Sequence, residues 1–101
     1  MAKKKTTRPP MHPGEILAHE FLEPMAMTQY ALARELHVPR RRINEIVHGK
    51  RGISAETALR LARFFGTSAQ FWMNLQARYD LELAAENWRD RIEREVPVHA
   101  A

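Results

Sequence analysis

Three consecutive arginines open a short stretch that reads as a helix, and an asparagine follows: Arg40, Arg41, Arg42 and Asn44. A guanidinium can donate two hydrogen bonds to the O6 and N7 atoms of guanine, and an asparagine amide pairs similarly with adenine. We therefore expect Arg40, Arg41 and Asn44 to contact bases in a DNA major groove. Arg42 is a further candidate, although the helical wheel places it partly to the side. Glu45 either accepts from cytosine or, as we expect, orients a neighbouring arginine.

Residues on either side of this stretch suit the DNA backbone. A helix that starts at Thr28 and Gln29 exposes amide N–H groups, which favour phosphate. Lys50 and Arg51 lie in the loop after the arginine-rich helix, where they are placed to hold the other strand. These four residues are candidate phosphate contacts, which would set register and salt dependence while the base contacts set sequence choice.

Apolar and small residues around these side chains predict two short helices that cross at a tight turn. Thr28 is a suitable N-cap for the first, and we take Pro39 as the first position of the second. His37 occupies the turn, where positive φ is expected and where histidine is among the tolerated residues. The residues expected at the crossing are Tyr30, Leu32, Ala33, Leu36, Val38, Ile43, Ile46 and Val47.

Capping residues and breakers divide the remaining chain into helices. We expect helices over residues 13–22, 28–36, 39–48, 55–65 and 69–83, and a weakly amphipathic stretch at 84–95. The predicted fold is all-α, a compact five-helix bundle with a helix-turn-helix and an optional extra C-terminal helix. The predicted organisation is a disordered basic arm (1–11), a DNA-binding domain (12–83), and a C-terminal helix and tail (84–101).

Composition supports an anionic partner for the first half of the chain. Residues 1–51 carry ten Lys/Arg against five Glu, whereas residues 52–101 carry six Arg against seven acidic residues. The chain has no cysteine, which excludes disulfides. No apolar run approaches the roughly 18 residues of a membrane span, and the basic start lacks the apolar stretch of a signal peptide. We expect a soluble cytoplasmic protein that binds no membrane.

The sequence gives little support for a metal site or an enzyme active site. None of the five histidines shows the i, i+4 spacing of a helical zinc site, and there is no thiolate to complete one. Neither a nucleophile with a base nor a glycine-rich phosphate loop is recognisable. We expect no enzyme activity, no metal or other cofactor and no small-molecule substrate.

Aromatic and apolar residues recur at helical spacing in the fifth helix: Phe71, Trp72, Leu75 and Tyr79. They either complete the core or form part of a dimer surface, and we carry all four as candidate interface residues. Trp88 and Ile92, further along, either cap the bundle or form a partner-binding edge.

Four longer segments of the sequence resemble those of a known family. They are HPGEIL (12–17), FLEPM (21–25), VPRRRINEIVHGKRGIS (38–54) and ETALRLARFFGTSAQFWMNLQARYDLE (56–82). Together they cover His12 to about Glu82 and resemble the HigA/VapI-type antitoxins of the Xre-like helix-turn-helix superfamily, whose fold is lambda-repressor-like.

The resemblance implies a homodimer that binds a palindromic operator and represses its own operon. It also implies a cognate HigB-type toxin, a small RelE-like ribonuclease that the antitoxin silences. Recognition residues of the family carry over onto the three arginines and Asn44, with Gln29 and Lys50 as phosphate contacts. Two alternatives stay open: a stand-alone Xre-type regulator without a toxin, and a protein-binding adaptor whose basic patch meets an acidic partner.

Overall fold

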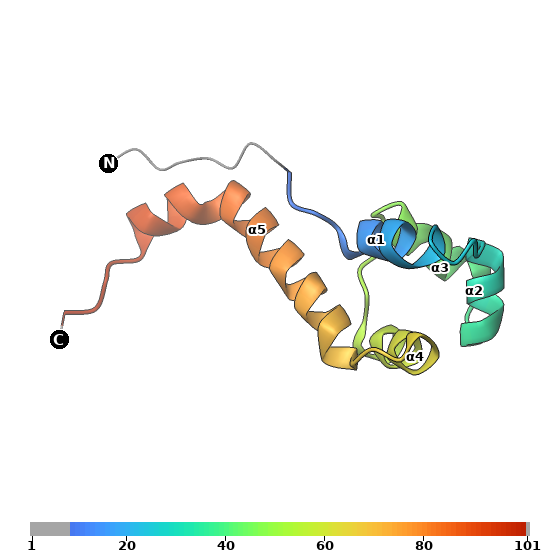
Figure 1. Ribbon diagram of the computed structural model, residues 1–101. Helices are drawn as coiled ribbons and strands as arrows, with labels where there is room; N and C mark the ends of the chain where they lie inside the picture. Colours follow the sequence, from blue (N-terminus) through green and yellow to red (C-terminus); the bar gives the residue numbers. More distant parts are fainter. Residues whose placement is uncertain (1–8, 101) are drawn as a thin grey trace.

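The computed structural model describes residues 9–100, and all its regular elements are helical (Figure 1). In chain order they are α1 (Pro13–Ile16), the π-helical segment η1 (Leu17–Leu22), α2 (Gln29–Leu36), α3 (Arg40–Val47), α4 (Ala55–Phe65) and α5 (Ala69–Glu95). Between residues 9 and 100 there is no strand, and the predicted all-α class is confirmed. Most of the predicted basic arm, residues 1–8, lies outside the described residues, and Pro9–Met11 form no helix.

The first helical unit begins at a cap made by His12. Its imidazole Nδ1 accepts a hydrogen bond from the Gly14 amide at 2.9 Å, and its own amide donates to the Glu15 carboxylate at 3.3 Å. This reciprocal arrangement satisfies two amides that have no partner within the helix. Pro13 follows at the first helical position, as predicted, because its missing N–H would have had no partner there.

The helix-turn-helix is formed by α2, the turn after it and α3. Thr28 caps α2, and His37 adopts the left-handed conformation with φ 58°, both as predicted. Pro39 differs from the prediction by one position. Its ψ of 142° is extended, so it is the N-cap of α3 and Arg40 is the first helical residue.

One hydrophobic core joins the helices, because α2 packs on α3 and α4, α1 packs on α3 and α5, and α4 packs along α5. Its fully buried side chains include Leu17, Leu32, Ile43, Ile46, Leu61 and Trp72. Tyr30 is the exception among the residues predicted at the α2–α3 crossing. Its side chain is 54% exposed, because it lies on the outer side of the first turn of α2.

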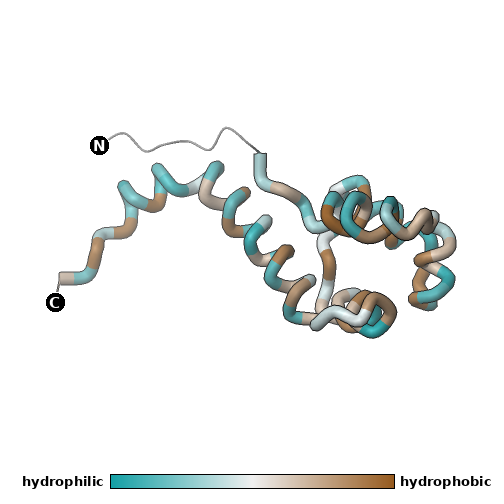
Figure 2. The backbone as a smooth tube through the Cα atoms, in the orientation of Figure 1, coloured by the Kyte–Doolittle hydropathy of each residue, from teal (hydrophilic) through white to brown (hydrophobic). Residues whose placement is uncertain are grey.

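The fifth helix continues past its predicted end near Leu83 and stops only at Glu95. No glycine or proline interrupts it, and Ala84 and Ala85 are strong helix formers. Residues 84–95 are therefore the second half of α5, so the separate additional helix is not formed. This half extends away from the other helices (Figure 1), and apolar positions recur along it (Figure 2).

Candidate nucleic-acid interface

Helix α3 is fixed in rotation by two fully buried isoleucines. Ile43 and Ile46 are both 0% exposed, so the opposite side of this two-turn helix faces solvent. Arg40, Arg41 and Asn44 are all exposed on it. The structure therefore brings three of the four predicted base-contacting residues onto the surface of one helix.

Arg41 is oriented by a carboxylate on its own helix. Its Nε donates to the Glu45 carboxylate at 2.9 Å, and the Arg51 Nε donates to the other oxygen of that carboxylate at 2.8 Å. The hydrogen bonds from Arg41 and then Arg51 lower the pKa of Glu45 below its usual value. Glu45 therefore orients Arg41, the role that we expected for it. Through Arg51 it also joins α3 to the loop that follows.

Arg42 has a different environment from the other two arginines. Its side chain is 23% exposed, and its guanidinium lies 3.1 Å from the Glu56 carboxylate and 3.4 Å from the Thr57 hydroxyl oxygen. Both partners belong to the start of α4. Hydrogen bonding from Arg60, followed by the charge of Arg42, lowers the pKa of Glu56. In this structure the Arg42 guanidinium links α3 to α4, and its role as a base contact stays a prediction.

Arg40 lies over an aromatic ring. Its guanidinium carbon is 5.2 Å from the centroid of Tyr30, and that of Arg34 is 5.9 Å from the same centroid. Within residues 9–100, no carboxylate forms an ion pair with Arg40. Sequence reasoning missed this role of Tyr30 by assigning it to the core. The available signal was its place on the first turn of α2, beside Gln29.

The start of α2 is linked to Asn44 of the recognition helix. The Asn44 amide donates to the Gln29 side-chain oxygen at 3.1 Å, and the Thr28 hydroxyl accepts from the Ala31 amide at 3.0 Å. The amides of Gln29 and Tyr30 precede the first intrahelical donors, so they remain suited to an anion. The other two predicted phosphate contacts lie after α3, where Lys50 is exposed and Arg51 is paired with Glu45.

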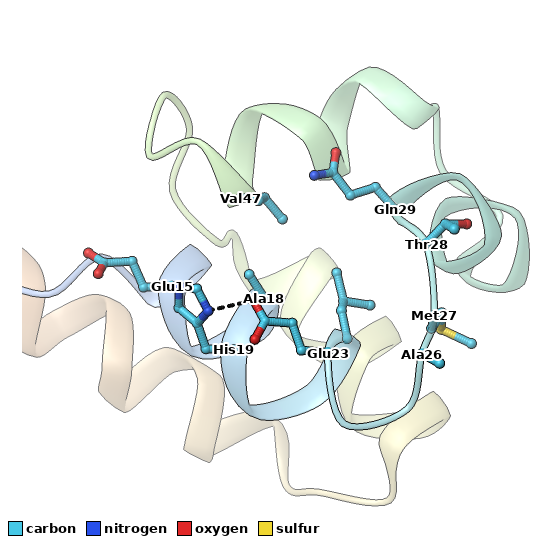
Figure 3. Close-up of a pocket in the computed structure, with 10 residues that line it drawn as sticks. Glu15, Ala18, His19, Glu23, Ala26, Met27, Thr28, Gln29 and Val47 are labelled. Atoms are coloured by element: carbon cyan, nitrogen blue, oxygen red, sulfur yellow. Dashed lines mark hydrogen bonds and ion pairs between the residues drawn. The ribbon is translucent and has the colours of Figure 1, made fainter.

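An open recess of about 520 Å³ lies beside this region (Figure 3). In the close-up, Glu15, His19 and Glu23 lie on the side of α1 and η1, while Thr28 and Gln29 lie at the start of α2. His19 Nδ1 and the Glu23 carboxylate are 2.7 Å apart at its rim. Two carboxylates make this recess unsuitable for phosphate, so the candidate interface is the α3 surface and not the recess.

The predicted dimer-interface residues make largely internal contacts. Trp72 is 0% exposed and donates from Nε1 to the Thr67 hydroxyl at 2.8 Å, so its assignment to a surface is wrong. Phe71 is 36% exposed and lies against Trp72, with ring centroids 5.0 Å apart. Leu75 packs against the core, and the rings of Tyr79 and His12 form an edge-to-face pair with centroids 4.8 Å apart.

Further along α5, apolar side chains are exposed. Leu81 is 72% exposed, and Trp88 and Ile92 are each 49% exposed. None of the three belongs to the core, which excludes the alternative that the last two residues cap the bundle. Among the described residues, no cluster of three or more His or acidic side chains could hold a metal ion, and no helix is long and apolar enough to cross a membrane.

Comparison with known proteins places this arrangement in a family. The helix-turn-helix family HTH_3 matches residues 19–72. Virulence-associated protein I of Dichelobacter nodosus is 54% identical over 83 residues, which cover 82% of this chain and 77% of that protein. Antitoxin HigA-1 of Vibrio cholerae serotype O1 is 40% identical over 78 residues, which cover 77% of this chain and 73% of that protein.

A solved structure extends the similarity to the whole fold. The Pseudomonas aeruginosa antitoxin HigA with the higBA promoter has a TM-score of 0.89 and 49% identity to this chain. The match covers 90% of this chain and 99% of that one, so it includes most of α5 as well as the helix-turn-helix. The chain belongs to the HigA-type antitoxins of the Xre-like helix-turn-helix family.

Proposed function

We propose that this protein is a sequence-specific DNA-binding repressor that acts as the antitoxin of a type II toxin–antitoxin pair. The observation that carries the proposal is the exposed surface of α3, on which Arg40, Arg41 and Asn44 present hydrogen-bond donors away from the core. A solved relative of the same fold is an antitoxin HigA with promoter DNA. The proposed role is non-enzymatic and cytoplasmic.

In the proposed complex, α3 enters the major groove and the start of α2 meets the phosphate backbone. Arg40, Arg41 and Asn44 read base edges, because guanidinium and amide groups match guanine and adenine. Gln29, Lys50 and the amides at the start of α2 hold phosphates and set the register. Arg51 is a further proposed phosphate contact, and its Nε remains hydrogen-bonded to Glu45.

Operator binding is tested by fluorescence anisotropy with a labelled duplex from the protein's own promoter and a scrambled duplex of equal length. We expect tighter binding to the promoter, with log affinity falling linearly against log salt on both duplexes. Half-sites are expected about 34–36 Å apart, one helical turn. Equal affinity for the two duplexes at every salt concentration would refute the repressor function and favour a protein-binding adaptor.

The antitoxin half of the proposal rests on the family, since relatives with this fold are named antitoxins. Its partner would be a small RelE-like ribonuclease of the HigB type, encoded next to this gene. The test is co-expression of this protein with the product of the adjacent short reading frame. We expect the two to co-purify and growth arrest by the neighbour alone to be relieved. If neither occurs while operator binding holds, the protein is a stand-alone regulator.

A palindromic operator requires two copies of the helix-turn-helix, so we propose that the protein is a homodimer. Leu81, Ala85, Trp88 and Ile92 fall at i, i+4, i+7 and i+11 on α5, which is the spacing of a coiled-coil seam. Packing two such faces together would remove their exposed apolar surface from water. The proposed dimer surface is therefore the second half of α5, with Phe71, Leu75 and Tyr79 contributing only their exposed edges.

A further inference from the structure

The three arginines of α3 differ in the partner that holds each guanidinium. Arg41 donates to Glu45 at 2.9 Å, and Arg42 lies 3.1 Å from Glu56. A carboxylate partner occupies donor N–H groups that would otherwise bond to a base or phosphate. In both arginines, one nitrogen of the guanidinium is already engaged in the protein without DNA: Nε in Arg41 and a terminal nitrogen in Arg42.

Arg40 is held in another way. Its guanidinium carbon lies 5.2 Å from the ring centroid of Tyr30, within the range at which a cation is attracted to an aromatic face. A ring face attracts the charge without accepting the in-plane hydrogen bonds of the guanidinium. The contact therefore restricts the conformation of the Arg40 side chain, while its guanidinium N–H groups stay available to donate to guanine.

The position of Tyr30 gives this contact a consequence for recognition. Tyr30 follows Gln29, which accepts a hydrogen bond from Asn44 at 3.1 Å. Two successive residues of α2 thus each hold one exposed side chain of α3. An unrestrained arginine loses side-chain entropy on binding, and a prior restraint reduces that loss.

We propose that Tyr30 is a positioning residue for operator recognition: its ring orders the Arg40 guanidinium on the DNA-facing side of α3 before DNA binds. The inference rests on the proposed function. It adds a residue that acts through Arg40, and the ring is the part of Tyr30 that matters.

The experiment compares Tyr30→Phe, which keeps the ring, with Tyr30→Leu, which keeps bulk but removes the aromatic face. Tyr30→Leu is expected to weaken operator binding about 2- to 5-fold, the effect of one exposed cation–π contact, and Tyr30→Phe to remain close to wild type. Leu59→Ala is the matched control, because Leu59 is also more than half exposed, on α4. In the DNA-free protein, the Arg40 side-chain NMR signals should show a ring-current shift in wild type and Tyr30→Phe that is absent in Tyr30→Leu.

Two further measurements separate positioning from a general structural effect. Base substitutions across the half-site should identify a base pair that loses its preference in Arg40→Ala, and Tyr30→Leu should weaken preference at that base pair alone. In the Arg40→Ala background, Tyr30→Leu should cost nothing more. An equal cost in both backgrounds, or loss of preference at every base pair alike, would overturn the proposal. If Arg40→Ala leaves operator affinity unchanged while wild type binds specifically, this inference fails and the proposed function stands.

Discussion

At the scale of single residues, the availability of a charged group depends on its immediate neighbours. Arg40, Arg41 and Arg42 have the same side-chain chemistry, yet they meet an aromatic ring, a carboxylate on the same helix and a carboxylate on α4. Lys50 is exposed, and its ammonium forms no ion pair within residues 9–100. From these neighbours we propose that Arg40 and Arg41 read bases, that Arg42 links α3 to α4, and that Lys50 binds phosphate.

Replacing Arg41 and Lys50 separately should distinguish base contacts from phosphate contacts. Arg41→Ala is expected to cost about 1–3 kcal/mol on the operator and to relax base choice at one position. Lys50→Ala should weaken all duplexes alike and reduce the salt slope by about 1. Anisotropy on operator and scrambled duplexes over a salt series measures both effects. Arg63→Ala, an exposed arginine on α4, is the control, and equal losses for Arg41→Ala on both duplexes would contradict the division.

His12 should make stability depend on pH. Burial lowers the pKa of His12 below its ordinary value of 6.5, outweighing the charge of Glu15, because the neutral ring is the one that fits its site. The unfolded chain then takes up a proton at a higher pH than the folded chain does. Stability is fully present above about pH 6.5 and falls as the pH drops through the window between that value and the lower folded-state pKa.

The measurement is the urea-unfolding free energy of wild type and His12→Asn from about pH 8 to pH 5. Asparagine retains an N-cap oxygen but does not titrate, so the difference between the two profiles isolates His12 from the other histidines. We expect wild type to lose more stability than His12→Asn as the pH falls. Parallel profiles would show that His12 does not contribute to the pH dependence.

At the scale of elements, close approach between helices holds the recognition helix in place. A Cβ atom added to Gly14, at the start of α1, would overlap the carbonyl oxygen of Ile46 in α3. The start of α1 therefore rests directly on the backbone of the last turn of α3. Arg60 of α4 adds a second link between elements, donating to the Leu36 carbonyl at the end of α2 at 2.9 Å.

Gly14→Ala should consequently separate α1 from α3. Because the obstacle is backbone and cannot rotate away, we expect a loss of about 1–3 kcal/mol or more in unfolding free energy. Gly66→Asn is the control, since Gly66 has φ 75° with open space around it and asparagine tolerates that conformation. Chemical denaturation of both variants measures the difference. A Gly14→Ala protein as stable as wild type would mean that α1 can shift without cost.

At the scale of the whole molecule, α5 extends beyond the bundle with an apolar face that no other part of residues 9–100 covers. The longest dimension is 52 Å, against 29 and 21 Å for the others. Leu81, Trp88 and Ile92 remain exposed on this extension. Association through it would place one helix-turn-helix on each side of a two-fold axis.

The double substitution Trp88→Glu and Ile92→Glu should therefore convert the dimer to a monomer. Both side chains are already half exposed, so the folding of each subunit should be preserved. Sedimentation velocity measures the oligomeric state, and circular dichroism verifies the helix content. Leu59→Glu is the control, because it places the same charge at an exposed apolar position on α4. A double variant that stays dimeric would move the interface towards Phe71.

Local signals in the sequence were sufficient for the starts of α2, α4 and α5 and for the turn, while the start of α3 was predicted one position early. Thr28, Ser54 and Ser68 each accept a hydrogen bond from an amide three residues ahead, and His37 adopts positive φ. Such features depend on residues within a few positions of one another. The end of α5 was predicted wrongly, because amphipathicity fades where the helix leaves the core although helix propensity does not.

By itself, the sequence determined the helix-turn-helix, the buried face of α3 and the exposure of Arg40, Arg41 and Asn44, because helical periodicity decides which residues share a face. Only the tertiary structure decided what each arginine contacts. Tyr30 is ten positions before Arg40, and Glu56 is fourteen after Arg42. Such pairs form only once α2, α3 and α4 are packed. The three arginines therefore have different partners because of the fold, although their side chains are identical.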